Sequence, residues 1–475
     1  MNFFSRPVHY ESLGRRDLRD LLLRLPAGAS SFLLESGLNP GDMGRWHLLG
    51  AHSVGSFVAE GDAWRWTVGV AEGDGLREDA GEQGAWTALE VWWREWSADA
   101  ALSGPTAGSP GANSGFAGGA VGYLGYEFGE LAEGLPPRPE GRKSRDVHLE
   151  LFDEGVIVDA TSGEAWAFHR DRDGREARRW WDGAARSVAS PWFPGHEELS
   201  LEREAYLQAV DAIREEIRWG DVYEVNLTRR HRWPGRGDPW ELYLRLRDAQ
   251  PVPYAAFLPW SPYAVLSASP ERFLHRRGSY VDTRPIKGTI ARGATEAEDA
   301  AHARELLASK KDRAELAMII DLERNDLGRV CVPGSVRVVE EAAVETYASV
   351  LHTVATVCGE LPEDFSPISL LRATFPGGSI TGAPKIAAMQ SIRRHEPVPR
   401  HAYTGSVGWI GPNGDLELSI AIRTVLLTPD ATEFSVGGAI TWDSTPAAEY
   451  DELAAKGEAI FRALGGGEGI SLDSE

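Results

Sequence analysis

Two helices expected in the second half of the chain turn acidic side chains toward the protein interior, which restricts how the chain can pack. The final helix begins at Thr445-Pro446, a cap residue followed by a proline at the first helical position. At about 100° per residue, it has an apolar stripe made of Leu453, Ile460 and Leu464. Glu449, Glu452 and Lys456 lie along the edge of this stripe. Acidic groups facing a core are costly unless they are paired or bind a metal.

A second helical region repeats the pattern. It starts at a capping box formed by Thr295 and Glu298, and we expect two helices that reach to about residue 327. Asp312 and Glu315 share a face with apolar residues there, whereas Asp321 points away. Two acid pairs, one on each helix, can converge on a hard divalent cation, and Mg²⁺ is the usual choice where a few carboxylates and a substrate oxyanion share a site.

An alternative explanation for these acids is internal ion pairing. Arg313 and Lys456 are available as partners, and Lys456 follows Glu452 by one helical turn, so that a simple i, i+4 pair also explains this position. The pattern of residues leaves both explanations open.

A short strand over residues 281–286 is predicted to stop at Lys287-Gly288. The glycine allows a tight turn and a close approach by a ligand. A lysine held at a rigid strand end and partly desolvated loses its proton more easily, and it can then act as a nucleophile. An ordinary surface lysine beside a turn is the alternative.

Two further polar residues interrupt apolar strands. Arg423 lies within a predicted strand over residues 417–427, where an arginine needs a carboxylate partner, and a bidentate grip on a substrate meets that need. His352 lies in the apolar run Val350–Val354, where a buried structural histidine and a site residue are both possible.

The composition excludes several classes of partner. The 475 residues carry a formal net charge of −22, which argues against binding to nucleic acid or to an anionic membrane. The two cysteines lack metal-type spacing. The start of the chain lacks the features of a signal peptide, and no apolar run approaches the roughly 20 residues that span a bilayer. We expect a cytoplasmic protein.

The chain divides into three predicted regions: an N-terminal region at 1–198, a catalytic region at 199–465 and a tail at 466–475. The second region opens with a helix for which Ser200 is the expected N-cap, followed by a strand that carries Glu224. In the first region, the glycine-rich run 118–127 is expected to be a strand packed against another backbone.

Long motifs, in order, make the chain resemble the chorismate-utilising enzymes, the family of anthranilate, aminodeoxychorismate, isochorismate and salicylate synthases. The motifs are Gly-Asp-Val-Tyr-Glu-Val-Asn-Leu (220–227), Ser-Pro-Glu-Arg-Phe (269–273), Arg-Pro-Ile-Lys-Gly-Thr (284–289), Lys-Asp-Arg-Ala-Glu (311–315), Asp-Leu-Glu-Arg-Asn-Asp-Leu-Gly-Arg (321–329), Phe-Pro-Gly-Gly-Ser-Ile-Thr-Gly-Ala-Pro-Lys (375–385) and Ile-Arg-Thr (422–424). Weaker matches at 33–36 and 118–123 extend the resemblance through the N-terminal region, which is therefore expected to be similar to that of anthranilate synthase component I.

The resemblance implies an α/β (α+β) fold of two halves, each with an antiparallel sheet and outer helices, and an active site between the halves. It implies that Glu315 and Glu452 bind Mg²⁺, with Asp312 and Glu449 in support. The remaining residues implied for substrate binding are Arg423, Tyr403, Gly437, Gly438, Lys456, His352 and Thr289. Glu271 is implied as the acid that protonates the departing 4-hydroxyl of chorismate.

Lys287 distinguishes among the members. Anthranilate synthases usually carry alanine at this position, and the lysine is similar to that of aminodeoxychorismate synthases, whose lysine is proposed to add at C2 while ammonia enters at C4. The resemblance therefore implies a transaminating, amidotransferase-type aminodeoxychorismate synthase on the route to p-aminobenzoate and folate. The alternatives are anthranilate synthase component I and a non-catalytic, tryptophan-binding relative.

Two departures from the usual pattern concern partners and a proton acceptor. Aminating members usually carry Gln where this chain has Glu224, which is expected either to help deprotonate ammonium or to pair with a lysine.

Segments 33–36 and 253–254 look like those that bind tryptophan in relatives. No glutaminase nucleophile is visible, so ammonia is expected from a separate glutamine amidotransferase subunit.

Overall fold

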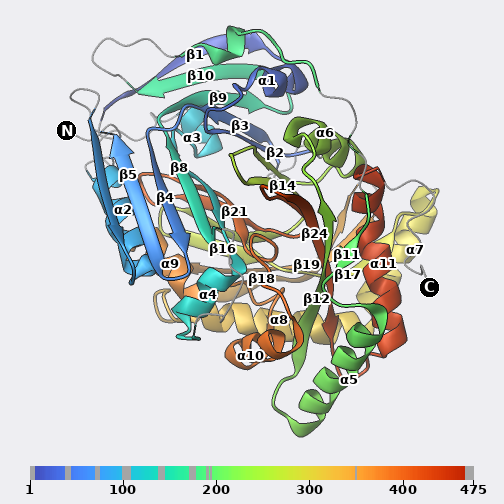
Figure 1. Cartoon of the computed structure of the whole chain (residues 1–475). Helices are drawn as coiled ribbons and strands as arrows, with labels where there is room; N and C mark the ends of the chain where they lie inside the picture. The colour runs from blue at the N-terminus through green and yellow to red at the C-terminus, as the bar shows by residue number, and fades with distance from the viewer. Residues whose placement is uncertain are drawn as a thin grey trace.

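The computed structural model describes residues 6–465 except for 38–43, 70–74, 99–107, 137–144, 171–177, 189–191, 193–194 and 348–349. The predicted tail at 466–475 lies outside the described residues. Within them the chain forms two twelve-stranded sheets, in which every strand pair is antiparallel. Figure 1 shows the sheets side by side, with helices outside them, and this confirms the predicted α/β fold with two antiparallel sheets and outer helices.

The first sheet, here sheet A, runs in the order β1-β10-β9-β3-β2-β13-β14-β23-β24-β12-β11, with β20 paired to β12. Its strands are β1 (Val8–Arg15), β2 (Ser31–Glu35), β3 (Trp46–Ala51), β9 (Glu154–Asp159), β10 (Glu164–Arg170), β11 (Glu198–Leu199), β12 (Glu224–Pro234), β13 (Tyr254–Leu258), β14 (Ala264–Ser269), β20 (Gly382–Ala383), β23 (Thr424–Leu427) and β24 (Ala431–Ile440).

The second sheet, sheet B, runs in the order β17-β19-β16-β15-β22-β21-β7-β8-β4-β5-β6, with β18 paired to β19. Its strands are β4 (Gly55–Glu60), β5 (Ala63–Gly69), β6 (Leu76–Gly81), β7 (Gly119–Leu124), β8 (Val147–Phe152), β15 (Arg272–Arg277), β16 (Tyr280–Arg284), β17 (Ile286–Ala291), β18 (Arg337–Thr346), β19 (Val350–Glu360), β21 (Ser406–Ile410) and β22 (Leu416–Ile420).

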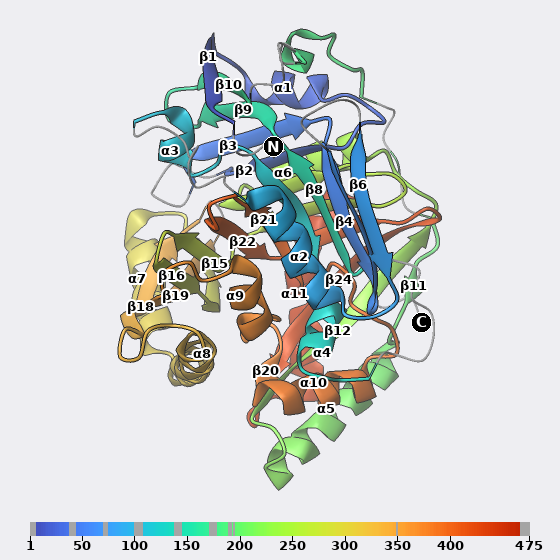
Figure 2. The ribbon, with the colours of Figure 1, turned by 90° about the vertical axis from the view of Figure 1, so that its left-hand side faces the viewer.

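The helices cover these sheets from outside (Figure 2). They are α1 (Leu18–Arg24), α2 (Ala85–Ser97), α3 (Pro110–Ser114), α4 (Tyr126–Ala132), α5 (Arg203–Trp219), α6 (Pro239–Ala249), α7 (Glu296–Ala308), α8 (Lys310–Gly328), α9 (Pro367–Thr374), α10 (Lys385–His395) and α11 (Pro446–Ala463). Helix α8 packs on β17 and β19 of sheet B, and α11 packs on β24 of sheet A. None of the helices described is long and apolar enough to cross a bilayer.

Each sheet contains strands from both sides of residue 198. Strands from the first region form one end of each sheet, and strands from the second region form the other end. The two groups meet at a single strand pair in each sheet, β2 with β13 in sheet A and β7 with β21 in sheet B. The boundary near residue 198 thus separates segments of the chain that share both sheets.

Two neighbouring connections carry the chain from one sheet to the other. Pro270-Glu271 joins β14 of sheet A to β15 of sheet B, and residues 421–423 join β22 of sheet B to β23 of sheet A. Backbone hydrogen bonds join each connection to the strand that leads into the other. The Ala268 amide donates to the Arg423 carbonyl at 3.0 Å, and the Ile420 amide donates to the Glu271 carbonyl at 3.0 Å. Glu271 and Arg423 are therefore held side by side where the sheets meet.

Three local predictions were wrong. The helix predicted at Ser200 begins at Arg203, because the Ser200 hydroxyl instead accepts the Arg230 amide at 2.9 Å. The strand over 281–286 is split at Pro285, which has no N–H to donate, so Lys287 is the second residue of a separate strand, β17, where it pairs with Thr353 of β19, and the first strand does not stop at it. The strand over 417–427 is split by Arg423, whose φ is +51°.

The predicted close packing of the run 118–127 is confirmed over β7, and helix α4, which the pattern did not indicate, follows it. A Cβ on Gly122 would lie 2.0 Å from the carbonyl oxygen of His148 on β8. Since that oxygen belongs to a strand in the sheet interior, it cannot move aside easily. Gly122 is thus required for β7 and β8 to pair.

We expect Gly122→Ala to destabilise the fold by about 1–3 kcal/mol, the usual cost of overpacking, as a lower midpoint of urea unfolding. Gly328→Ala is the matched control, because a Cβ there meets no atom within 4 Å. Equal midpoints for the two variants would contradict the requirement for glycine at 122.

Candidate active site

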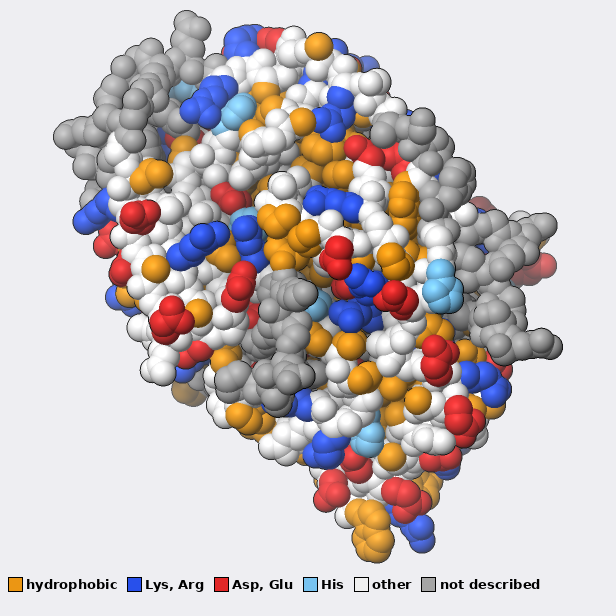
Figure 3. All heavy atoms as spheres, in the orientation of Figure 1, with side chains coloured by type: hydrophobic (Ala, Val, Ile, Leu, Met, Phe, Trp, Pro, Cys, Tyr) orange, Lys and Arg blue, Asp and Glu red, His pale blue; other side chains and the backbone are white. Residues whose placement is uncertain are grey.

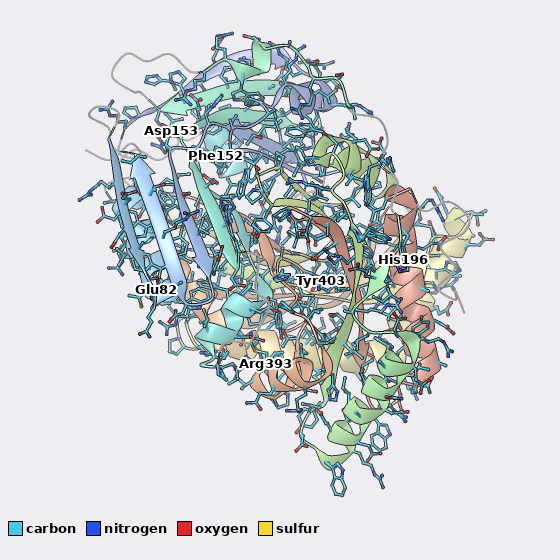
Figure 4. The ribbon with its side chains drawn as sticks, in the orientation of Figure 1. Glu82, Phe152, Asp153, His196, Arg393 and Tyr403 are labelled. Carbon is cyan, nitrogen blue, oxygen red and sulfur yellow. The ribbon has the colours of Figure 1, made fainter. Side chains whose placement is uncertain are left out.

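A cavity of about 670 Å³ lies between β12 and β24 of sheet A and β17 and β19 of sheet B, with α8 and α11 beside it. Most of the predicted site residues line it, namely Lys287, Glu271, Arg423, Tyr403, Lys456, His352, Thr289, Gly437, Glu315, Glu452 and Asp312. Gly438 and Glu449, also predicted, do not line the cavity. Figure 4 labels Tyr403 near the centre of the view, away from the outer helices.

Lys287 and Glu224 form a buried ion pair across the two sheets. The Lys287 Nζ lies 2.8 Å from the Glu224 Oε1, and Glu224 is fully buried. The other oxygen, Oε2, is buried without a hydrogen-bond partner among the described residues. One of the two expectations for Glu224, pairing with a lysine, is therefore confirmed.

The ion pair changes the expected behaviour of the lysine. Burial alone would lower the pKa of Lys287, but the neighbouring carboxylates, Glu224 first, outweigh it and raise the pKa above its ordinary value. The expectation that desolvation eases loss of the proton is wrong for this arrangement. Lys287 is an ammonium ion here, and its proton must be transferred before it can act as a nucleophile.

Glu271 has the properties of a general acid. Its carboxyl is 4% exposed, and burial raises its pKa to about 7, although hydrogen bonding by Ser379 and the charge of Lys287 act to lower it. The Ser379 hydroxyl donates to the Glu271 Oε1 at 2.5 Å. A carboxyl with a pKa near neutrality can hold a proton and release it during a reaction.

The four acids predicted to bind a metal lie in different surroundings. Burial raises the pKa of Glu315 to about 6 and also raises the pKa of Glu449. Glu452 is 44% exposed and forms an ion pair with Lys456 at 2.6 Å, whose charge outweighs the effect of burial and lowers the Glu452 pKa. The i, i+4 pairing left open by the sequence is thus present for Glu452.

These acids supply some, but not all, of the ligands that a divalent cation needs. Glu315 Oε1 and Glu449 Oε2 are buried without hydrogen-bond partners among the described residues. Within the described ranges, no group of three or more His, Cys, Asp or Glu side chains could hold a metal by itself. Mg²⁺ is commonly bound by one or two carboxylates together with substrate oxygens and water, so this donor set suits a cation that binds with its substrate.

Two further lining residues, Arg423 and His352, carry no negative charge. Arg423 donates to the Gln250 side chain at 3.4 Å, and burial lowers its pKa. The His352 ring shares a hydrogen bond with Thr289 at 2.8 Å, and burial together with the charge of Arg423 lowers the His352 pKa to about 4. His352 is therefore neutral, and its Nε2 lacks a hydrogen-bond partner among the described residues. Arg423 remains available for an anionic ligand.

The two predicted glycines lie where β24 passes β12. Lys456 donates to the Gly437 carbonyl at 3.3 Å. A Cβ on Gly438 would lie 3.3 Å from the Glu449 Oε2, behind the cavity wall. Gly437 thus contributes to the cavity surface, whereas Gly438 leaves room for the buried acid.

Several lining residues were not predicted, including Asn226, Gln250, Lys311 and Ser379. Ser379 lies in the glycine-rich loop 375–385, which the sequence marked without assigning it a function. Gln250 follows α6, and no sequence signal distinguishes it from other helix-terminal residues.

A second cavity of about 440 Å³ lies away from the first, between β2, β13 and the strands around β15. Leu34, Glu35 and Ser36 line it together with Pro253 and Tyr254, so the two segments compared with tryptophan-binding segments do come together. Figure 3 shows basic and acidic side chains interspersed over the visible face of the molecule, without a single-sign patch.

Comparison with known proteins defines the class. The model of chorismate binding enzymes matches residues 56–462, and the chain belongs to this family. It is 41% identical over 351 residues to aminodeoxychorismate synthase component 1 of Klebsiella aerogenes, covering 74% of this chain and 78% of that one. It is 38% identical to aminodeoxychorismate synthase of Streptomyces griseus, over 92% of this chain and 61% of that protein's length.

Among solved structures, the fold is similar to anthranilate synthase component I of Streptococcus pneumoniae. The TM-score is 0.73 at 25% identity, and the match covers 89% of this chain and 93% of the other. The implied two-sheet architecture of the family is therefore observed here.

The Lys287–Glu224 pair gives a prediction for stability. We expect Lys287→Ala to destabilise the protein by about 3–5 kcal/mol in urea unfolding, because it leaves the Glu224 carboxylate buried without its cation. Adding Glu224→Gln should restore most of the loss, since no net charge is then buried. Additive effects of the two substitutions would show that the pair is not coupled.

Proposed function

We propose that this chain is the chorismate-binding subunit of an aminodeoxychorismate synthase, which aminates chorismate at C4 with ammonia in a Mg²⁺-dependent reaction. The observation that carries the proposal is a lysine, Lys287, and a carboxylic acid with a pKa of about 7, Glu271, on the wall of one cavity. The similarity to proteins named aminodeoxychorismate synthase supports it. The reaction is transaminating and of amidotransferase type.

The first half-reaction uses three side chains. Glu224, 2.8 Å from the amine, accepts a proton from Lys287. The neutral amine forms a bond to C2, both ring double bonds shift (C1=C2 to C1=C6 and C5=C6 to C4=C5), and the C4–O bond breaks. Glu271 gives its proton to the departing hydroxyl, which leaves as water.

The second half-reaction restores the protein. Ammonia adds at C4, both ring double bonds shift back, and Lys287 leaves C2 with the bonding electron pair as a neutral amine. The new C4 ammonium gives a proton to Glu271, and Glu224 returns its proton to Lys287. The net change is replacement of the C4 hydroxyl by an amine with release of water.

The remaining lining residues bind the two carboxylates of chorismate. Arg423 and Tyr403, which both line the cavity, hold the enolpyruvyl carboxylate by charge and hydrogen bonding. Glu315 and Glu452, supported by Asp312 and Glu449, hold Mg²⁺, which when bound neutralises the ring carboxylate. One carboxylate oxygen each of Glu315 and Glu449 is buried without a hydrogen-bond partner among the described residues, although Lys311 lies 3.8 Å from that of Glu315, and these oxygens support this assignment.

The partners follow from the reaction. Ammonia comes from a glutamine amidotransferase subunit, and the name component 1 carried by a relative is consistent with a second component. We further propose that the 440 Å³ cavity binds tryptophan, because residues 34–36 and 253–254 line it together. A cytoplasmic location remains a prediction.

Product identification tests the lysine. With chorismate, ammonium and Mg²⁺, the wild type is expected to yield p-aminobenzoate only after an aminodeoxychorismate lyase is added. Lys287→Ala should lose this product and release fluorescent anthranilate, because C2 is then open to ammonia. The exposed Lys310→Ala is the control and should keep the wild-type product. Direct formation of anthranilate by the wild type would favour anthranilate synthase instead.

Calorimetric titration with Mg²⁺ in the presence of chorismate tests the metal site without turnover. Glu315→Gln should weaken Mg²⁺ binding by roughly 100-fold or more, as loss of a ligand exceeds the usual effect of an outer contact. Asp321→Asn, on the same helix with its side chain 81% exposed, should bind Mg²⁺ as the wild type does. Unchanged affinity in Glu315→Gln would rule out this carboxylate as a ligand.

A further inference from the structure

The glycine-rich loop 375–385 is held in place at three consecutive residues. The Gly378 amide donates to the Glu323 carboxyl at 3.1 Å, and the Asn226 side chain donates to the Ser379 carbonyl at 3.3 Å. The Arg400 guanidinium donates to the Ile380 carbonyl at 3.0 Å. These three anchors come from α8, β12 and the segment after α10, so the loop is fixed from three sides.

Two of the anchors are buried ionisable groups. Glu323 is 3% exposed and Arg400 is 4% exposed. Burial, reinforced by the charge of Asp326, raises the pKa of Glu323 above its ordinary value. Buried groups of this kind are costly, and here all three contacts converge on the backbone around one residue, Ser379.

The side chain fixed by this arrangement contacts the general acid. The Ser379 hydroxyl donates to the Glu271 Oε1 at 2.5 Å, and both residues line the cavity of about 670 Å³. Glu271 itself lies in the two-residue connection between the sheets. Its carbonyl accepts from the Ile420 amide at 3.0 Å, and its carboxyl accepts a backbone hydrogen bond from Ile286, so Ser379 supplies the side-chain hydroxyl that completes its contacts. The serine therefore restrains the carboxyl at its reacting end.

We infer that Ser379 is a positioning residue for amination, which holds Oε1 of Glu271 as a hydrogen-bond acceptor so that the carboxyl presents its acidic proton from Oε2 to the leaving hydroxyl. This inference rests on the proposed function, because it takes Glu271 as the acid. Glu323, Asn226 and Arg400 act through the loop backbone to keep the hydroxyl in place.

The contact also affects when Glu271 is protonated. The charged groups that face Glu271 are Lys287 from β17 and Glu323 from α8. A hydroxyl that donates to a carboxylate stabilises the ionised form, so the Ser379 contact lowers the pKa of Glu271, as does the charge of Lys287. Removal of the hydroxyl should therefore raise the pKa of Glu271.

The test compares Ser379→Ala with Ser379→Thr, which keeps a hydroxyl. In the wild type, kcat for ammonia-dependent amination should fall as pH rises through about 7, where Glu271 loses its proton. In Ser379→Ala this alkaline limb should move upward by roughly one pH unit, and kcat below the limb should fall roughly tenfold. Ser379→Thr should restore the wild-type limb.

A matched control is Ser31→Ala, because Ser31 is also buried and its hydroxyl has no hydrogen-bond partner among the described residues. It should leave the profile unchanged. If the limb of Ser379→Ala coincides with that of the wild type, or if Ser379→Thr fails to restore it, the inference is overturned.

A second measurement does not depend on turnover. The infrared absorption of the protonated Glu271 carboxyl, assigned by its loss in Glu271→Gln, should titrate at higher pH in Ser379→Ala than in the wild type. An unshifted titration would overturn the inference even if the variant is inactive. Formation of anthranilate by the wild type, with a shifted Glu271 titration, would instead overturn the proposed function and leave the Ser379 contact standing.

Discussion

The buried contact between Lys287 and Glu224 is the interaction on which the cavity depends. Lys287 belongs to β17 of sheet B and Glu224 to β12 of sheet A, so their ion pair of 2.8 Å joins the two sheets at the cavity wall. A charge buried without its partner costs several kcal/mol, and the two strands are therefore held at a fixed separation. The same contact sets the protonation of the amine, which links the architecture to the chemistry.

Three residues of the site come from places where regular structure is interrupted, whereas Lys287 and Glu224 lie in strands β17 and β12. Glu271 lies in the connection from β14 to β15, Arg423 in the connection from β22 to β23, and Ser379 in a loop. Regular strands can present side chains only on two alternating faces. Because these residues lie outside the strands, their side chains can point into a cavity between the two sheets. Backbone hydrogen bonds around the two connections keep Glu271 and Arg423 in position.

The sequence predicted the site best where a charged side chain occupies a position that packing alone would make apolar. Acidic residues beside an apolar helical stripe were predicted to turn inward, and Asp312, Glu315 and Glu452 do line the cavity, whereas Glu449 does not. The motifs indicated Glu271, which also lines it. Ser379 and Gln250 were missed, because serine in a glycine-rich loop and glutamine after a helix are common where no site exists. Their importance depends on contacts between segments distant in the chain.

The predictions of local structure failed for a related reason. Arg423 was read as part of one long strand, yet its φ of +51° turns the chain from one sheet into the other. Side-chain polarity does not report such a backbone angle. Likewise, desolvation of Lys287 was expected from its position in the chain, but the carboxylate that reverses its effect on the pKa comes from a strand 63 residues away in sequence.

The sharing of both sheets has a consequence for how this protein can be divided. Removal of the first region would uncover one edge each of β13 and β21, which are now paired with β2 and β7. Open interior strands of this kind present unpaired amides and carbonyls to any other extended chain. The second region, which bears the chemistry, therefore cannot be transferred to another protein without the first. Recombination that adds or exchanges whole domains is tolerated only outside the two shared sheets.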